Sequence, residues 1–252
     1  GQRVFGPGIQ RGMGDLMRRI TIAALAGLIC VAPAVSVAPL AAQEHNTLTQ
    51  AERDSGWELL FDGHSLDGWR RYDGEPMTGG WAAESGTLTH STGGRDIITE
   101  AEYTDFELTI EWKISEGGNS GLFYRAALGE EWVYHSAPEM QILDDSGHAD
   151  GQNPVTSAGS NYALHPAPRG LVHPVGEWNT VRLVVRGNAV EHWLNGTKIV
   201  MYEFGSPEWK ELVAASKFSE FPAYGQAKSG HLGLQDHGNR VWFRDIKLRE
   251  LR

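Results

Sequence analysis

The chain has little cysteine, little positive charge and no long uninterrupted apolar run. Cys30 is the one cysteine among 252 residues, so the chain cannot form an intramolecular disulfide or a cysteine-rich zinc site. Lys and Arg number 22 against 32 Asp and Glu, a formal net charge of −10, whereas phosphate backbones and anionic membranes attract clustered positive charge. The main apolar run is short, and Pro33 and Pro39 follow it closely. We therefore expect no nucleic-acid partner and no membrane span.

Several signatures of known catalytic and binding sites are also missing. The sequence has no His-Glu-x-x-His pair and no Gly-x-Ser-x-Gly elbow, which excludes the common zinc-protease and serine-hydrolase patterns. The glycine-rich segment 117–121 lacks the lysine of a phosphate-binding loop. The acidic segment 144–150 lacks the spacing and terminal Glu of a calcium loop. Binding of a divalent cation by that segment stays an open alternative, although no clear motif supports it. We expect neither a cofactor nor a metal site.

The first 42 residues read as a targeting segment. Met17-Arg18-Arg19 is followed by an apolar run from Ile20 to Val31 and by small residues up to Ala42, the order typical of a secretory signal peptide. We expect residues 17–42 to be the signal peptide and residues 1–16 an upstream extension. Cys30 follows Leu and Ile rather than a small residue, which disfavours lipid anchoring. The protein is therefore expected to be exported, to the periplasm or outside the cell.

From Gly56 onward, apolar and polar residues alternate with the period of β-strands. Asn195-Gly196 separates two such runs and suits a type I′ hairpin turn. One helix is expected from Pro207 to Phe218, with Ser206 as its cap. This pattern predicts an all-β sandwich of two antiparallel sheets in one domain, residues 55–252. The main expected strands are Trp57–Phe61, Thr87–His90, Phe106–Trp112, Gly121–Tyr124, Glu139–Leu143, Trp178–Val185, Val190–Leu194, Thr197–Val200, His231–Asp236 and Val241–Leu251.

The segment 139–144, Glu-Met-Gln-Ile-Leu-Asp, is the most informative for chemistry. On a strand, Glu139 and Gln141 share one face, while Met140 and Ile142 share the other and suit a core. The polar face lies either in solvent or in a cleft. The irregular segment that follows, residues 144–174, is long for a loop in a compact domain, and such loops are often functional.

Two further segments carry candidate residues. In the segment 231–238, Gly233, Gln235 and His237 share one face, and Gly233 leaves room for a ligand or a neighbouring strand. A single His beside Gly238 is equally compatible with a solvated turn. Arg125 follows the glycine-rich segment 117–121 and suits a carboxylate or sugar hydroxyls. All nine Trp lie beyond residue 42, where they can pack in the core or stack on sugar rings.

Seven motifs in order resemble those of the 3-keto-disaccharide hydrolase family. They are WELLFDG with LDGW (57–69), NSG (119–121), EMQILD (139–144), GEWN (176–179), HWLNG (192–196), LQDHG (234–238) and FRDI (243–246). The resemblance covers about Gly56 to Leu251. It implies a concanavalin A-like jelly-roll sandwich and cleavage of glycosides already oxidised to a ketone at C3. Asp245 stands where members commonly carry Asn, a minor departure.

The resemblance, together with the chemistry, suggests roles for individual residues. A ketone at C3 acidifies the C2 proton, so one base can start an elimination that water addition completes. We expect Glu139 or His237 to be the base, with the other assisting the departing oxygen. Arg125, Gln141 and Lys217 are expected to polarise the keto or enolate oxygen. The remaining candidate sugar contacts are Asn119, Tyr124, Asp144, Tyr162 and Gln235. The substrate also implies an oxidoreductase upstream that introduces the ketone.

Two alternatives stay open at this point. The concanavalin A-type fold is also a lectin fold, so the protein could be a non-catalytic carbohydrate-binding module. It could also be an ordinary glycoside hydrolase, which needs two carboxylates on one face. Asp144 would supply the second carboxylate only if a bulge turned it onto the face of Glu139.

Overall fold

The computed structural model describes residues 44–251. The expected upstream extension and signal peptide lie outside the described residues. Within residues 44–251, no helix combines the length and the apolar character that crossing a membrane requires.

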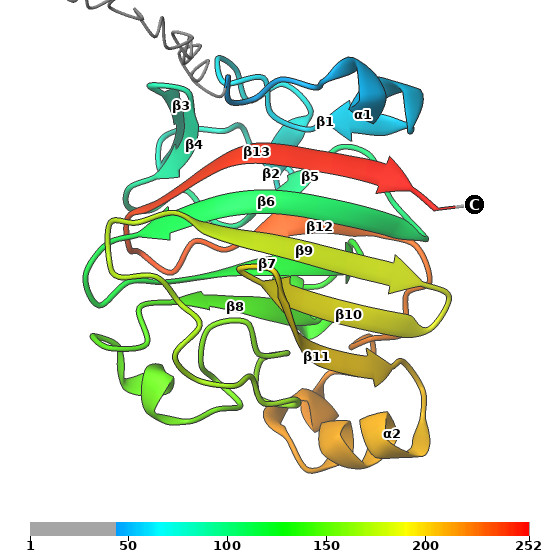
Figure 1. The fold of residues 1–252 in the computed structure, drawn as a ribbon. Coiled ribbons are helices and arrows are strands. Elements are labelled where there is room, and N and C mark those ends of the chain that lie inside the picture. The colour runs from blue at the N-terminus through cyan, green and yellow to red at the C-terminus, as the bar shows by residue number, and fades with distance from the viewer. Residues whose placement is uncertain (1–43, 252) are drawn as a thin grey trace, which may run out of the picture. The chain divides into compact units, whose positions relative to one another are not determined.

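The described residues form two antiparallel sheets packed face to face (Figure 1). The eight-stranded sheet has the order β11-β10-β9-β6-β13-β4-β3, with β1 also paired to β13. Its strands are β1 (Trp57–Leu59), β3 (Trp81–Glu84), β4 (Thr87–His90), β6 (Phe106–Ile114), β9 (Asn179–Arg186), β10 (Ala189–Leu194), β11 (Thr197–Glu203) and β13 (Val241–Glu250). The five-stranded sheet has the order β2-β5-β12-β7-β8. Its strands are β2 (Trp69–Arg71), β5 (Ile97–Thr99), β7 (Asn119–Ala126), β8 (Glu139–Leu143) and β12 (His231–Leu234).

Short helices lie between the strands. They are α1 (Gln50–Asp54), α2 (Pro207–Ala214) and the 3-10 helices η1 (Val133–His135), η2 (Ala149–Gln152) and η3 (Lys217–Glu220). The Ser206 side chain accepts a hydrogen bond from the Trp209 amide and caps α2, as expected from the sequence. α1 was not expected, although Thr49 and Glu52 form the capping box that its sequence pattern indicates.

The large hydrophobic core lies between the two sheets. Leu122 and Tyr124 of β7 and Met140 and Ile142 of β8 belong to it. Because successive side chains on a strand point to opposite faces, the residues between them lie on the side turned away from the eight-stranded sheet. We call this side the outer face of the five-stranded sheet. The β7–β8 connection, residues 127–138, covers part of it, where Val133 and Ala137 cluster with Ile98 and Phe123.

The structure confirms the two-sheet antiparallel sandwich that the sequence predicts. β4 and β8 have the expected bounds, and Asn195 and Gly196 both have positive φ in the turn between β10 and β11. β2, β3 and β5, of three or four residues each, were not expected. The folded part also begins upstream of Ser55: the Asn46 amide donates to Asp245 Oδ1 at 2.6 Å, and the Asp245 amide donates to Asn46 Oδ1 at 2.9 Å.

Candidate active site

The candidate site is built around Gly121, in the middle of the outer face of the five-stranded sheet. β7 and β8 pair in continuous register, with Gly121 opposite Gln141 and Phe123 opposite Glu139. A Cβ atom on Gly121 would lie 1.9 Å from Glu139 Oε1 and 2.6 Å from Glu139 Cδ. The carboxylate of Glu139 therefore lies directly over the glycine, in the space that any other residue would fill.

Three amide side chains surround the same glycine. Asn119 precedes Gly121 by two residues on β7, and Gln141 pairs with it on β8. The backbone N–H of Gln235 donates to the Gly121 carbonyl at 3.0 Å. The side-chain oxygens of all three are buried, and among the described residues they have no hydrogen-bond partner. A buried polar atom without a partner costs free energy unless water or a ligand satisfies it. The arrangement thus presents hydrogen-bond acceptors suited to the hydroxyl groups of a sugar.

Glu139 is buried, with 5% of its surface exposed, yet no described side chain donates a hydrogen bond to its carboxylate. Burial raises its pKa to about 8, the Lys217 ammonium lowers it, and the carboxylates of Asp96 and Asp150 raise it further. A carboxyl group that can exchange a proton near neutral pH is suited to general acid–base chemistry.

Lys217 and Tyr162 lie beside Glu139. The Tyr162 amide donates to the Glu139 carbonyl at 2.9 Å, and the Lys217 ammonium lies 4.6 Å from the centre of the Tyr162 ring. Burial, with the negative charges of Asp150 and Glu139, raises the pKa of Tyr162 to about 12, so its hydroxyl stays protonated at neutral pH. The structure therefore places one cation and one hydroxyl donor close to the buried carboxylate.

Sequence reasoning missed Asp96. It directly precedes β5, is 8% exposed, and accepts a hydrogen bond from the Asp236 amide at 2.9 Å. Burial raises its pKa to about 7. No local signal in the sequence singles it out, because its neighbours across the sheet are distant in the chain.

Two expected site residues lie elsewhere. Tyr124 is fully buried between the sheets, where its hydroxyl contacts His192 Nε2 at 2.8 Å and the Tyr202 hydroxyl at 2.6 Å. Arg125 has a φ of 53°, which interrupts the strand alternation, and its guanidinium donates to the carbonyls of Thr104 and Gly187. A sugar contact by Tyr124 or a role of Arg125 at the keto oxygen does not fit these placements.

Asp144 and His237 are also separate from the Glu139 carboxylate. Asp144 accepts hydrogen bonds from the Gly117 and Ser146 amides, so its carboxylate holds the loop that follows β8. His237 is exposed, and its ring centre lies 6.2 Å from that of His148. It makes no hydrogen bond to Glu139 or Gln141. The ten expected residues thus divide into six around Gly121 and Glu139 (Asn119, Glu139, Gln141, Tyr162, Lys217 and Gln235) and four outside that group (Tyr124, Arg125, Asp144 and His237).

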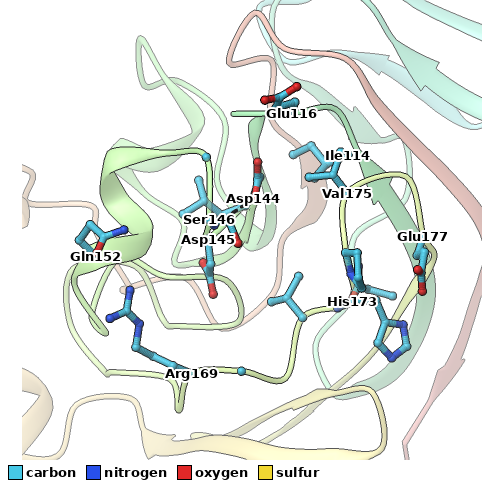
Figure 2. A pocket seen from close by; sticks show the side chains of 16 residues that line it. Ile114, Glu116, Asp144, Asp145, Ser146, Gln152, Arg169, His173, Val175 and Glu177 are labelled. Carbon is cyan, nitrogen blue, oxygen red and sulfur yellow. Dashed lines mark hydrogen bonds between the residues drawn. The ribbon is translucent and has the colours of Figure 1, made fainter.

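A cavity of about 760 Å³ lies beyond the end of β8, but Glu139 does not line it. Figure 2 shows Asp144 and Asp145 on one wall and His173 and Glu177 on the other. Its volume suits a small molecule. However, the described residues that line it include no Trp, Tyr or Phe, and Asp144 already accepts two backbone hydrogen bonds. We therefore place the reactive centre at Glu139, where a carboxylate and three amide oxygens lack partners.

Two side chains of the eight-stranded sheet and one from the segment before α1 have spacing that could hold a metal ion. The ligand atoms of His45, Glu111 and Asp245 lie within 4.8 Å of one another. Each is already engaged: His45 Nδ1 lies 2.6 Å from Asp245 Oδ2, and Arg244 Nε donates to Glu111 at 2.7 Å. The cluster therefore fastens residues 45–46 to β13, and the adjoining guanidinium disfavours a cation.

A two-sheet sandwich that holds a buried, unpaired carboxylate among sugar-compatible amides defines a glycosidase-like, carbohydrate-active enzyme. More particularly, the chain belongs to the 3-keto-alpha-glucoside-1,2-lyase-like family, whose model matches residues 56–249. The 3-keto-disaccharide hydrolase of Bacteroides thetaiotaomicron is 34% identical over 244 residues, covering 84% of each chain.

Solved structures agree with this assignment. A protein from Parabacteroides distasonis with a provisional glycosyl hydrolase designation superposes with a TM-score of 0.77 at 33% identity, covering 83% of this chain and 100% of that one. A second protein from the same organism, with the same designation, has a TM-score of 0.61 at 28% identity, covering 77% and 99%. The resemblance inferred from the seven sequence motifs is thus confirmed at the level of family and enzyme class.

Proposed function

We propose that this protein cleaves glycosides that carry a ketone at C3 of the sugar, by removing the C2 proton, expelling the C1 oxygen and adding water. Family membership and the name of the Bacteroides relative support the substrate class. The observation that carries the proposal is the Glu139 carboxylate, buried over Gly121 without a hydrogen-bond donor.

Each step has a residue suited to it. Glu139 accepts the proton from C2, and the electron pair of that bond moves into an enolate at C3. The Lys217 ammonium and the Tyr162 hydroxyl are the nearby groups that can stabilise the negative enolate oxygen. Collapse of the enolate forms the C1–C2 double bond and breaks the C1–O bond. Water then adds to C1 as Glu139 returns its proton to C2, so the net reaction is hydrolysis.

The two alternative functions, an ordinary glycoside hydrolase and a carbohydrate-binding module, have less support. An ordinary glycosidase with Asp144 as its second carboxylate requires a bulge, but the β7–β8 register contains none, and Asp144 is held by backbone amides. A lectin site has no use for a buried carboxyl group whose pKa is about 8.

The test is to offer the purified protein a 3-keto-α-glucoside and its unoxidised parent in deuterated water. We expect cleavage of the keto glycoside alone, with deuterium at C2 of the released sugar. Glu139→Gln should lose both cleavage and exchange, by a factor of about 10²–10⁴ as for a general base. Equal cleavage of both glycosides, or a Glu139→Gln variant with unchanged rates, would overturn the proposal. Binding of the parent without any product would instead favour a lectin.

We further propose that the protein is exported and acts downstream of a sugar oxidation. The basic, apolar and small-residue order of residues 17–42 supports export. A 3-keto sugar has to be formed by an oxidoreductase that removes two electrons and two protons at C3. Fractionation of the producing cells tests the location: retention of the protein in the cytoplasm would contradict export.

A further inference from the structure

We propose that Asp96 is the second proton-transfer residue of the site and protonates the departing C1 oxygen. This inference rests on the proposed cleavage of 3-keto glycosides. It replaces the expectation that His237 shares the proton transfers with Glu139.

The strand register places Asp96 across the site from Glu139. Gly233 pairs with Ile98 and Leu234 with Ile97, so Asp96 continues β5 beside Gln235. β12 and β7 lie between β5 and β8. Three strand spacings of about 4.8 Å give roughly 14 Å between the two backbones, before either side chain reaches inward.

The row of the sheet that runs from Asp96 crosses Gln235 and Gly121 and reaches Gln141. Gly121 on β7 has no side chain, and the Glu139 carboxylate leans over it toward the row of Asp96, whereas Phe123 packs over Gly233 one row further along the sheet. The Gln235 and Gln141 amides line the same row of the sheet. A sugar ring between β5 and β8 would therefore have a carboxyl group on either side and amide acceptors beneath it.

Asp96 has one oxygen available for this role. One carboxylate oxygen accepts the Asp236 amide N–H, and no described group donates to the other. Three charged groups surround it. The Asp236 carboxylate accepts the Arg95 amide N–H at 2.9 Å and lies 2.9 Å from His90 Nε2, and the Arg95 guanidinium lies 4.1 Å from the centre of the Trp132 ring.

The positions of the two carboxyl groups match the stereochemistry of an α-glycoside. In the chair form, the C1–O bond and the C2–H bond are both axial and point to opposite faces of the ring. Glu139 and Lys217 lie together, so the base and the cation for the enolate act from one side. Asp96 then donates its proton to the C1 oxygen as the C1–O bond breaks, and recovers a proton from the water that adds to C1.

The two carboxyl groups also titrate in the range this exchange needs. Burial raises the pKa of Asp96 to about 7, an effect that Arg95 and His90 moderate and that the charge of Asp236 increases. The corresponding value for Glu139 is about 8. Between these two values the site holds one proton, which resides mainly on Glu139. The reactive form, with Glu139 ionised and Asp96 protonated, is the minor of the two singly protonated forms and reaches its maximum over the same pH range.

Asp96→Asn is the informative variant, because the amide oxygen of Asn can still accept the Asp236 amide. We would compare two 3-keto-α-glucosides, one with an alkyl leaving group and one with 4-nitrophenol, which needs no protonation to depart. Asp96→Asn should lose about 10²–10⁴-fold in kcat on the alkyl glycoside and less than ~10-fold on the nitrophenyl glycoside. It should still exchange the C2 proton with deuterated water, whereas Glu139→Gln should not.

The control is Asp145→Asn, a substitution at another half-buried Asp that accepts one backbone amide, from Ala158 at 2.8 Å. It should leave both rates unchanged. The role of Asp96 would be overturned if Asp96→Asn lost the same factor in kcat on both substrates, or if it no longer exchanged the C2 proton. A kcat equal to that of the wild type on the alkyl glycoside would also overturn it. If the wild-type protein neither exchanges nor cleaves, the proposed function itself fails.

Discussion

The carboxylate of Glu139 occupies the space that a side chain at position 121 would take. Oε1 lies 1.9 Å from the place of the missing Cβ atom, so the residue type on β7 determines where the carboxylate on β8 can lie. The pairing of Phe123 with Glu139 and of Gly121 with Gln141 fixes this relationship. Glycine at position 121 therefore leaves room for the carboxylate, and no turn requires it.

Gly121→Ala tests this relationship. The added methyl group must displace the Glu139 carboxylate, so we expect a loss of activity of at least about 10²-fold and a loss of stability of about 1–3 kcal/mol. Denaturant unfolding measures the stability and steady-state kinetics the activity. In a Glu139→Ala background the methyl group has room, so the stability loss should largely disappear. Additive effects of the two substitutions would contradict the contact.

Glu139→Gln should stabilise the protein at alkaline pH. The pKa of Glu139 is about 8 in the folded state, against an ordinary value of 4.5, so the folded protein binds this proton more tightly than the unfolded chain. The protonated form is most stable below pH 4.5, and stability falls as the pH rises to about 8. Gln cannot ionise, so its advantage should grow across this range and exceed about 1 kcal/mol above pH 8, the equivalent of one pKa unit.

Unfolding curves at several pH values measure this difference directly. Glu203→Gln is the matched control, because Glu203 is exposed, and its effect should stay within about 0.5 kcal/mol. An advantage of Glu139→Gln that does not change between pH 5 and pH 9 would show that Glu139 is not buried as a carboxyl group.

The rate of keto-glycoside cleavage should have a bell-shaped pH dependence with its maximum between about 7 and about 8. Below the pKa of about 7 for Asp96, both carboxyl groups are protonated and no base remains. Above the pKa of about 8 for Glu139, both are ionised and no acid remains. Lys217 and Asp150 act on Glu139, while Asp236, Arg95 and His90 act on Asp96. A kcat/KM profile that is flat from pH 6 to pH 9 would contradict the paired roles.

Removing the imidazole at position 237 should have little effect. His237 is exposed and makes no hydrogen bond to Glu139, so His237→Ala should change kcat/KM by less than ~3-fold, within the range of an ordinary surface substitution. The same kinetic assay with Asp96→Asn provides the contrast. A loss of 10²-fold or more in His237→Ala would return the catalytic role to the histidine.

Strand alternation predicted the parts of this site that depend on one strand alone. It placed Glu139 and Gln141 on one face of β8, and Gln235 on the face of Gly233, as the structure has them. The same rule also separates Tyr124 from Gly121, because Tyr124 shares the core face with Leu122. Composition and turn chemistry were sufficient for the sandwich, the hairpin at Asn195-Gly196 and the cap at Ser206.

The remaining features of the site depend on pairings between distant segments and on local departures from regular strand geometry. Asp96 enters the site only because β5 pairs with β12, more than a hundred residues further along the chain. Arg125 leaves the face that alternation gives it because its φ is positive, and the β7–β12 register shifts nearby. Neither effect has a signature in the residues that surround Asp96 or Arg125 in the sequence.

Tyr124→Phe separates a core role from a substrate-binding role. His192 Nδ1 donates to the Gly159 carbonyl at 3.0 Å, and burial lowers the pKa of His192 to about 4, so its Nε2 is a neutral acceptor. The Tyr124 hydroxyl must then donate to His192 Nε2 and accept from the Tyr202 hydroxyl. Removing it leaves one buried acceptor and one buried donor unpaired, which should cost about 1–3 kcal/mol of stability. At a temperature where the variant is folded, KM for the keto glycoside should stay within ~2-fold of wild type; a larger rise in KM without loss of stability would place Tyr124 at the substrate.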